Sequence, residues 1–167
     1  MLSSDAVVHE LYEGDELRDA VVGRFGLEVA PGGVVDRSAV AQRAFADPQD
    51  RQWLEGVVWP MVGARVAGWL EHARTQEPAP RAAVVEVPLL FEAGLEAAYD
   101  ATIAVIAEEA VRAGRAAARG HASVDERAAR QLSQEEKASR ATFVIHNDGT
   151  EEDLQRELSS VLDKLGR

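Results

Sequence analysis

The sequence lacks several features that define common classes of protein. Its 167 residues include no cysteine, which excludes disulfide bonds, thiolate metal sites and a cysteine nucleophile. No apolar run approaches the ~20 residues that span a bilayer. The N-terminal residues show no basic segment followed by an apolar one, the pattern of a secretory signal peptide. We therefore expect a soluble, cytoplasmic protein with no membrane partner.

Positive charge is also scarce. The chain carries 29 acidic and 18 basic side chains, which gives a net charge of −11. Because an acidic surface repels DNA, RNA and anionic lipids, we expect no nucleic-acid partner. The four histidines show no metal-ligand spacing, so the sequence predicts no metal site built by the protein alone. The length suits one compact domain.

Capping residues and helical spacing predict that the first half of the chain is helical. The first expected helix begins at Ser4 or Asp5 and ends at Tyr12, and the second runs from Asp15 to Phe25 before Gly26. A third follows Asp36, with Val40, Ala44 and Phe45 on one face, and a fourth follows Asp47-Pro48 and carries Trp53, Leu54 and Val57. A fifth begins at Pro60, with Val62, Val66, Trp69 and Leu70 on one side. A loop is expected at residues 77–81.

The second half has a different pattern. Residues 82–87, 102–107 and 142–145 are continuous apolar runs, which are typical of parallel strands covered on both faces. A short helix is expected at 92–98, and Thr150 is expected to cap a final amphipathic helix. The alternation of strands and helices predicts an α/β fold with a doubly wound parallel sheet.

Ligands bind beyond the carboxyl ends of the strands in such a sheet. Glu86 lies near one such end, where it could hold a metal-bound water or a substrate hydroxyl. Glu92 could anchor the loop by accepting backbone N–H bonds at a helix start. The alternative is that Glu92 only caps a helix and Glu86 only points into solvent.

Basic residues concentrate in one stretch of this acidic chain: Arg112, Arg115, Arg119, Arg127, Arg130, Lys137 and Arg140. Arg115 and Arg119 are four residues apart and share a helix face. A lid that closes over a transferred phosphoryl group needs such charges. The alternative is a solvated helix whose arginines pair with neighbouring glutamates.

Asp5 stands just ahead of the first expected helix. A carboxylate in this place could accept a proton from an attacking hydroxyl. The alternative is that Asp5 is simply the N-cap of that helix.

Together these features resemble the dephospho-CoA kinase family. The most specific match is the sequence VPLLFE at residues 87–92, which resembles a signature of that family. Further matching segments follow in the family's order, namely Ser4-Asp5-Ala6, His9-Glu10, Asp36-Arg37, Phe45-Ala46-Asp47-Pro48, Arg115, Arg119, Gln131, Lys137 and residues 144–149. The similarity runs from Ser3 to the C-terminus.

The resemblance implies ATP-dependent, Mg²⁺-assisted phosphorylation of the ribose 3′-hydroxyl of dephospho-CoA, the last step of coenzyme A biosynthesis. It implies that Asp5 is the general base and that Arg115 is the lid cation that meets the transferred phosphate. The remaining implied site residues are Arg37, Pro88, Leu89, Leu90 and Glu92 for the acceptor, and Arg119, Asn147 and Gly149 for the nucleotide.

The same resemblance implies one domain over residues 1–167 with a P-loop kinase-like fold. A helical acceptor-binding region would occupy about 13–80 and a helical lid about 108–140. The α/β core would comprise 82–107 and 142–165. Two positions depart from the family pattern: Ser3 stands where the family often has an aspartate, and Trp59-Pro60 replaces its usual His-Pro.

The family's phosphate-binding loop has no counterpart in this sequence. The motif G-x-x-x-x-G-K-[ST] does not occur, and neither lysine, Lys137 or Lys164, follows a glycine. We therefore expect that Met1 is not the natural start and that the fold lacks its first strand and its P-loop. We also expect that this chain alone has negligible kinase activity. The alternative hypothesis is a catalytically inactive relative that binds a CoA-like ligand or a partner protein.

Overall fold

The computed structural model describes residues 1–118 and 131–166. The chain divides into two compact units, Met1–Val87 and Pro88–Arg167. The single-domain organisation expected from the sequence stays a prediction.

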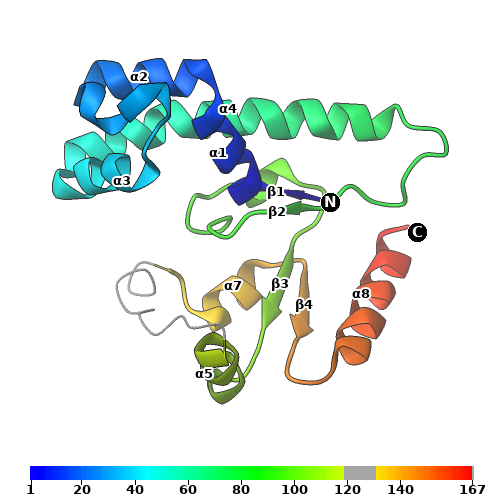
Figure 1. The fold of residues 1–167 in the computed structure, drawn as a ribbon. Coiled ribbons are helices and arrows are strands. Elements are labelled where there is room, and N and C mark those ends of the chain that lie inside the picture. Colours follow the sequence, from blue (N-terminus) through cyan, green and yellow to red (C-terminus); the bar gives the residue numbers. More distant parts are fainter. Residues whose placement is uncertain (119–130, 167) are drawn as a thin grey trace. The chain divides into compact units, whose positions relative to one another are not determined.

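Unit 1 is mostly helical (Figure 1). Its elements, in chain order, are β1 (Leu2–Ser3), α1 (Ser4–Glu13), α2 (Asp15–Phe25), the short 3₁₀ turns η1 (Leu27–Val29) and η2 (Pro31–Gly33), α3 (Arg37–Ala46), α4 (Pro48–Arg74) and β2 (Val85–Glu86). Two local signals act as expected. The Asp36 carboxylate accepts from the backbone N–H groups of Ser38 and Ala39 and so caps α3. Gly26 ends α2 with φ 93°, a conformation that favours glycine.

The core of unit 1 is aliphatic and is built by α1, α2, α3 and α4. Leu17, Val21, Val29 and Val40 are completely buried there. Burying an aliphatic side chain of this size stabilises the fold by about 1.5–3 kcal/mol. This core therefore supplies the main support for the helices that carry Asp5 and Arg37.

Helix α4 corrects one prediction. We expected Pro60 to begin a new helix, but α4 continues through it from Pro48 to Arg74. Proline has no N–H, so the carbonyl four residues earlier, at Gly56, loses its helical partner. The helix persists because apolar residues before and after Pro60, including Trp53, Val58 and Val62, all pack on the same core.

Strand β1 was not expected from the sequence. It pairs in parallel with β2, with Leu2 opposite Val85 and Ser3 opposite Glu86. A two-residue strand carries no periodic pattern of its own, so its pairing with a segment far along the chain is what defines it. Strand β2 is correspondingly shorter than the run 82–87 from which it was predicted.

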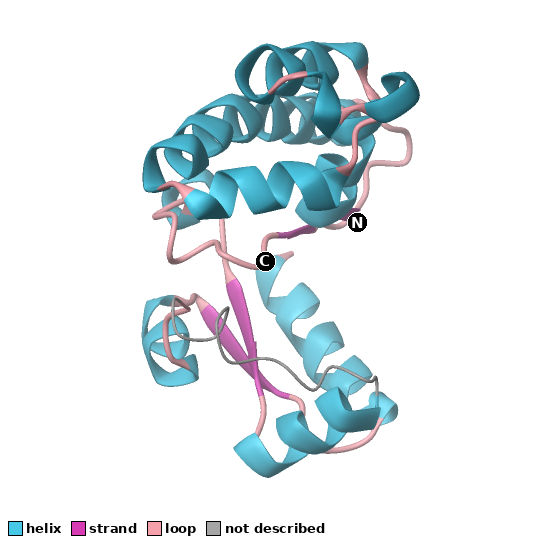
Figure 2. Ribbon diagram, turned by 60° about the vertical axis from the view of Figure 1, so that its left-hand side comes forward, coloured by secondary structure: helices cyan, strands magenta, loops and turns pink. Residues whose placement is uncertain are grey.

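Unit 2 contains a second pair of parallel strands, shown side by side in Figure 2. Its elements are η3 (Glu96–Ala98), β3 (Ile103–Ile106), α5 (Glu109–Ala118), α7 (Gln134–Arg140), β4 (Phe143–His146) and α8 (Glu151–Leu165). Helix α7 packs on β3 and α8 packs on β4. The most deeply buried side chains are Ile145, Phe91 and Val161.

Capping boxes set the starts of two helices in unit 2. At α7, Ser133 and Glu136 exchange side-chain and backbone hydrogen bonds, and Thr150 and Asp153 do the same at α8. The predicted cap at Thr150 is confirmed. Each box satisfies two N–H groups that the first turn of a helix leaves without partners.

Three further predictions are corrected by the structure. Residues 88–94 form turns followed by η3, so no regular helix covers 92–98. Phe45 is 68% exposed, because α3 buries only the face that carries Val40 and Ala44. Asp5 is not the N-cap of α1: that position is Ser3, and Asp5 lies in the first turn. Among the described residues, no helix is long and apolar enough to cross a membrane.

Replacing Pro60 by alanine tests the continuous helix. The variant restores a backbone hydrogen bond at an exposed position, and an interior proline costs about 3 kcal/mol. The more flexible unfolded chain offsets up to about 1 kcal/mol of this gain. We expect Pro60→Ala to raise the free energy of unfolding by about 2 kcal/mol. Urea unfolding followed by tryptophan fluorescence measures it, because all three tryptophans, Trp53, Trp59 and Trp69, lie in unit 1.

The exposed substitution Gln52→Ala on the same helix is the control, with an expected change near zero. A Pro60→Ala variant no more stable than this control would contradict a continuous α4.

Candidate functional site

The first candidate region lies at the carboxyl ends of β1 and β2. Glu86 ends β2 and is paired with Ser3, which ends β1. Asp5 follows two residues later, exposed in the first turn of α1. The positive end of the helix dipole favours a carboxylate there. Parallel pairing therefore brings the chain segments of both predicted acids to one edge, where a hydroxyl could be oriented and deprotonated.

Arg37 is the second predicted site residue in unit 1. It is the first residue of α3, and its guanidinium contacts two residues of α1. Arg37 Nη1 lies 2.5 Å from His9 Nδ1, and the guanidinium carbon lies 5.7 Å from the centre of the Tyr12 ring. Burial raises the pKa of Tyr12, while the Arg37 charge acts in the opposite direction. The Arg37 guanidinium is therefore held by an imidazole and an aromatic ring.

Another candidate region lies at the carboxyl ends of β3 and β4 in unit 2. The Arg115 side chain, from α5, donates to the carbonyl oxygen of Asn147 at 2.6 Å and to that of Gly149 at 3.3 Å. The structure thus brings Arg115 of α5 to the turn after β4 that carries two other predicted site residues, Asn147 and Gly149. The guanidinium secures the turn after β4, and a role as lid cation stays a prediction.

Further hydrogen bonds stabilise the same edge. The backbone N–H of Glu108 donates to Asp148 at 2.6 Å. The Gln134 side chain both accepts from and donates to the Ala107 backbone, at 2.9 Å in each case. These bonds satisfy backbone groups where β3 ends, so the edge has a defined shape for a ligand.

The VPLLFE stretch adopts turns at the start of unit 2. Pro88 and Leu89 are exposed, and Leu90 is half-buried. An exposed proline and leucine are available to an apolar or aromatic part of a ligand. The acceptor role of these three residues stays a prediction.

Glu92 has structural partners on a distant segment. Its carboxylate Oε1 accepts from the backbone N–H of Leu132 at 3.0 Å and pairs with Lys137 Nζ at 2.8 Å. Only 14% of the Glu92 side chain and 21% of the Lys137 side chain are exposed. Burial raises the pKa of Glu92, but the bonds from Lys137 and the backbone outweigh it and hold this pKa below its usual value. Glu92 therefore ties the VPLLFE turn to α7.

The remaining basic side chains of the predicted lid fit the solvated-helix alternative in part. Arg112 pairs with Glu109 on the same helix. Arg140 pairs with Glu96, and its guanidinium carbon lies 5.4 Å from the centre of the Phe91 ring. Arg119, predicted to bind the nucleotide, lies outside the described residues.

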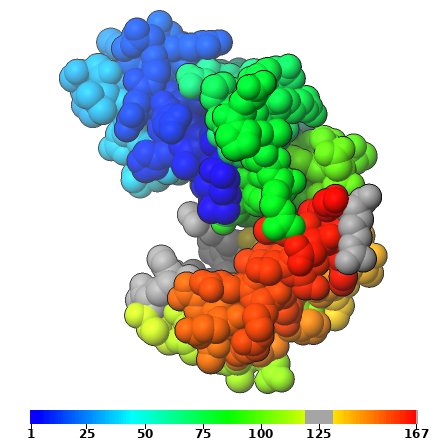
Figure 3. Space-filling model, turned by 90° about the vertical axis from the view of Figure 1, so that its right-hand side faces the viewer, coloured from blue at the N-terminus to red at the C-terminus, as the bar shows by residue number. Residues whose placement is uncertain are grey.

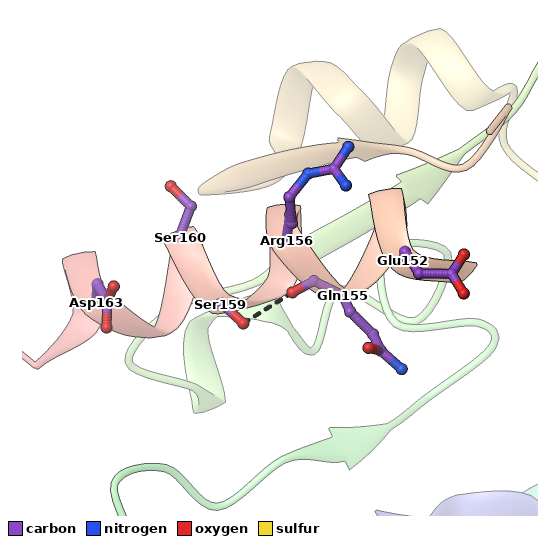
Figure 4. Close-up of a pocket in the computed structure, with 6 residues that line it drawn as sticks. All are labelled: Glu152, Gln155, Arg156, Ser159, Ser160 and Asp163. Carbon is purple, nitrogen blue, oxygen red and sulfur yellow. Dashed lines mark hydrogen bonds between the residues drawn. The ribbon is translucent and has the colours of Figure 1, made fainter. Parts of the chain in front are cut away.

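A shallow depression of about 630 Å³ lies along α8, and none of the predicted site residues lines it. Its lining residues all come from that helix: Glu152, Gln155, Arg156, Ser159, Ser160 and Asp163. Figure 4 shows these side chains along one surface of α8, which forms the orange-to-red surface in Figure 3. Since a single helix cannot enclose a ligand, the strand-end residues are the stronger candidate site.

No group of three or more acidic or histidine side chains that could hold a metal occurs in 1–118 or 131–166. Magnesium in kinase sites is bound by one or two carboxylates together with substrate phosphates. The described residues therefore do not form a metal cage by themselves.

The sequence did not predict that His9 and Tyr12 contact Arg37. His9 and Tyr12 lie three residues apart on α1, a spacing that places them on one face. That spacing was visible, but their common partner Arg37 lies in another helix. The bond between Glu92 and Lys137 was missed for the same reason: the two are joined only by folding.

Substituting Glu92 by glutamine tests the tie between the VPLLFE turn and α7. Glutamine can still accept from Leu132 but cannot form the ion pair. We expect Glu92→Gln to reduce the opening free energy of the Leu132 amide by about 1.5–3 kcal/mol near pH 7. Hydrogen exchange measured by NMR reports this amide directly.

The same experiment has a predicted pH dependence. Because the pKa of Glu92 is lowered on folding, its stabilisation is present above the unfolded value of 4.5 and is lost as the pH falls through the lower folded value. We expect the difference between wild type and Glu92→Gln to shrink on acidification. Glu135→Gln, at an exposed position of α7, is the control. Equal behaviour of the two variants would contradict a stabilising pair.

Comparison with known proteins identifies the family. The family model for dephospho-CoA kinase matches residues 1–153. Dephospho-CoA kinase from Deinococcus radiodurans is 40% identical over 153 residues, covering 90% of this chain and 70% of that protein.

Solved structures agree with this match. A crystal structure of a Thermus thermophilus protein superposes with a TM-score of 0.74 at 35% identity, covering 98% of this chain and 83% of the other. Dephospho-CoA kinase from Campylobacter jejuni has the same fold, with a TM-score of 0.69 at 22% identity over 99% of this chain and 84% of the other. The predicted α/β fold with parallel strands, that of the P-loop kinases, is confirmed. The chain belongs to the dephospho-CoA kinase family, whose members are phosphotransferases.

Proposed function

We propose that this protein takes part in the ATP-dependent phosphorylation of the ribose 3′-hydroxyl of dephospho-CoA. The supporting observation is the position of Asp5 beyond the carboxyl end of β1, at the edge where β2 ends in Glu86. This edge is where ligands bind in folds with parallel sheets. A cytoplasmic location accompanies the proposal, because ATP is available there.

In this proposal Asp5 orients the 3′-hydroxyl and accepts its proton as the oxygen attacks the γ-phosphorus of ATP. The bond from that phosphorus to the β,γ-bridging oxygen breaks, and ADP leaves. Arg37, Pro88, Leu89, Leu90 and Glu92 are assigned to the acceptor. Glu92 acts through its hold on the turn, since Lys137 and Leu132 occupy its bonded oxygen.

On the nucleotide side, we assign Asn147, Gly149 and Arg119 to ATP, and Arg115 to the transferred phosphate. The resemblance assigns the turn that carries Asn147 and Gly149 to the adenine of ATP. Arg115 contacts this turn now, so its guanidinium would have to leave the carbonyl oxygens of the turn to meet the transferred phosphate. Magnesium offsets phosphate charge in this chemistry and would be held mainly by the phosphates.

This chain lacks the Gly-rich motif that surrounds the phosphates of ATP in P-loop kinases. We therefore propose that it binds dephospho-CoA but transfers phosphate poorly when alone. The second candidate function is a non-catalytic relative that binds a CoA-like ligand or a partner protein. It is favoured by the same missing motif.

Two measurements test the proposal on the 167-residue chain. Calorimetry should detect binding of dephospho-CoA and little or no binding of ATP. A radiometric assay should find phosphorylation below about a thousandth of the rate of an intact relative, because positioning and charge stabilisation of the phosphates provide most of the rate enhancement. Failure to bind dephospho-CoA would overturn the acceptor assignment, and a rate near that of the relative would overturn the proposed inactivity.

Asp5→Asn tests the assignment of Asp5 as the general base. Any residual phosphorylation should fall by about 10²–10⁴-fold, because asparagine cannot accept the proton. Asp100→Asn, at an exposed loop position, is the control and should leave the residual rate unchanged. A residual rate insensitive to Asp5→Asn would show that another group is the base.

A further inference from the structure

We propose that His9 and Tyr12 are positioning residues that orient Arg37 toward a phosphate or diphosphate group of the acceptor. The inference rests on the proposed function for the identity of that acceptor, which carries a diphosphate. It concerns unit 1 alone and depends on the chemistry of the partners that Arg37 has in α1.

The partners of Arg37 differ from those of other arginines in unit 1. Five of these pair with a carboxylate within the described residues: Arg18, Arg24, Arg43, Arg51 and Arg74. No such ion pair is found for Arg37 in the part of the chain that the structure describes. Its side chain is also exposed, so its charge is available to a ligand.

His9 orients this charge without neutralising it. Arginine has N–H donors and no acceptor, so the histidine nitrogen that faces it must accept. Arg37 Nη1 lies 2.5 Å from Nδ1 and 3.2 Å from Nε2, and only a ring nitrogen that carries no proton can accept from it. A carboxylate at position 9 would also orient the guanidinium, but it would cancel the charge that an anion needs.

Tyr12 is the second side chain that contacts the Arg37 guanidinium. Its ring packs against the aliphatic core, and the guanidinium carbon lies 5.7 Å from the ring centre. A guanidinium over an aromatic ring keeps its N–H groups free to form hydrogen bonds in its own plane. Since His9 bonds only Nη1, the remaining donors can form the paired bonds that phosphate oxygens accept.

The helix end beside Arg37 is already satisfied. The Asp36 carboxylate takes the N–H groups of Ser38 and Ala39 at 2.9 and 3.1 Å. An anion at this place would therefore be bound by the Arg37 side chain, because the N–H groups of Ser38 and Ala39 already donate to Asp36. This explains why the positioning of one guanidinium matters.

The first experiment uses pyrophosphate as the probe and NMR of the His9 ring in the full chain as the readout. We expect pyrophosphate to shift the His9 ring signals in the wild type and to leave them unchanged in Arg37→Ala. Arg65→Ala, which removes an exposed arginine of α4, is the control and should behave as the wild type. Unchanged His9 signals in the wild type would overturn the inference, whatever dephospho-CoA does.

The second experiment measures dephospho-CoA affinity by calorimetry in a double-mutant cycle. Arg37→Ala should weaken binding by about 10-fold or more, and His9→Ala by a smaller factor. Because His9 acts through Arg37, the double variant should bind no more weakly than Arg37→Ala alone. Additive losses would overturn the inference. A wild type that fails to bind dephospho-CoA would overturn the proposed function but not the pyrophosphate result.

Two conservative variants separate positioning from simple stability. His9→Gln keeps a side-chain acceptor and should recover most of the affinity that His9→Ala loses. Tyr12→Phe keeps the ring and should bind dephospho-CoA as the wild type does. Tyr12→Leu should weaken binding when Arg37 is present, but should cause no further loss when it is added to Arg37→Ala. His9→Gln behaving as His9→Ala would contradict the role of the histidine as an acceptor.

Discussion

Parallel pairing between strands far apart in the chain is the constraint on which both units depend. In unit 1 the register places Ser3 opposite Glu86, so β1 and β2 end at the same edge. In unit 2 it places Ile106 opposite His146, so the segments after β3 and β4 also meet. The candidate site residues follow these strand ends directly. They are Asp5 in unit 1 and, in unit 2, the turn after β4 to which Arg115 donates hydrogen bonds. A slip of one residue in either register would present different side chains there.

The partners of the arginines show how the protein divides its few positive charges. Where an arginine or lysine supports the fold, it contacts a carboxylate or a carbonyl, as Lys137 contacts Glu92 and Arg115 contacts Asn147. Arg37 instead contacts an imidazole and an aromatic ring. In a chain with a net charge of −11, a cation that keeps its charge is the natural place for an anionic substrate.

Sequence patterns predicted the local features well because those features depend on neighbouring residues. Asp36, Gly26 and Thr150 act at helix ends as expected, since a cap contacts backbone groups only two or three residues away. Pro60 failed as a helix start because the packing of both halves of α4 outweighs the lost hydrogen bond. Strand β1 was missed because two residues hold no period, and its partner lies beyond four helices.

The sequence by itself determined the family, through the VPLLFE stretch and the ordered matches around it, and it determined which residue types are available for chemistry. Only the tertiary structure decided which of them meet. Glu92, expected to anchor a loop, accepts from the backbone of the distant Leu132 and pairs with Lys137. The Arg37 guanidinium contacts His9 and Tyr12 of another helix. The physical reason is that capping and periodicity are interactions along the chain, whereas ion pairs, stacking and strand register join segments that only burial of the apolar core brings within reach.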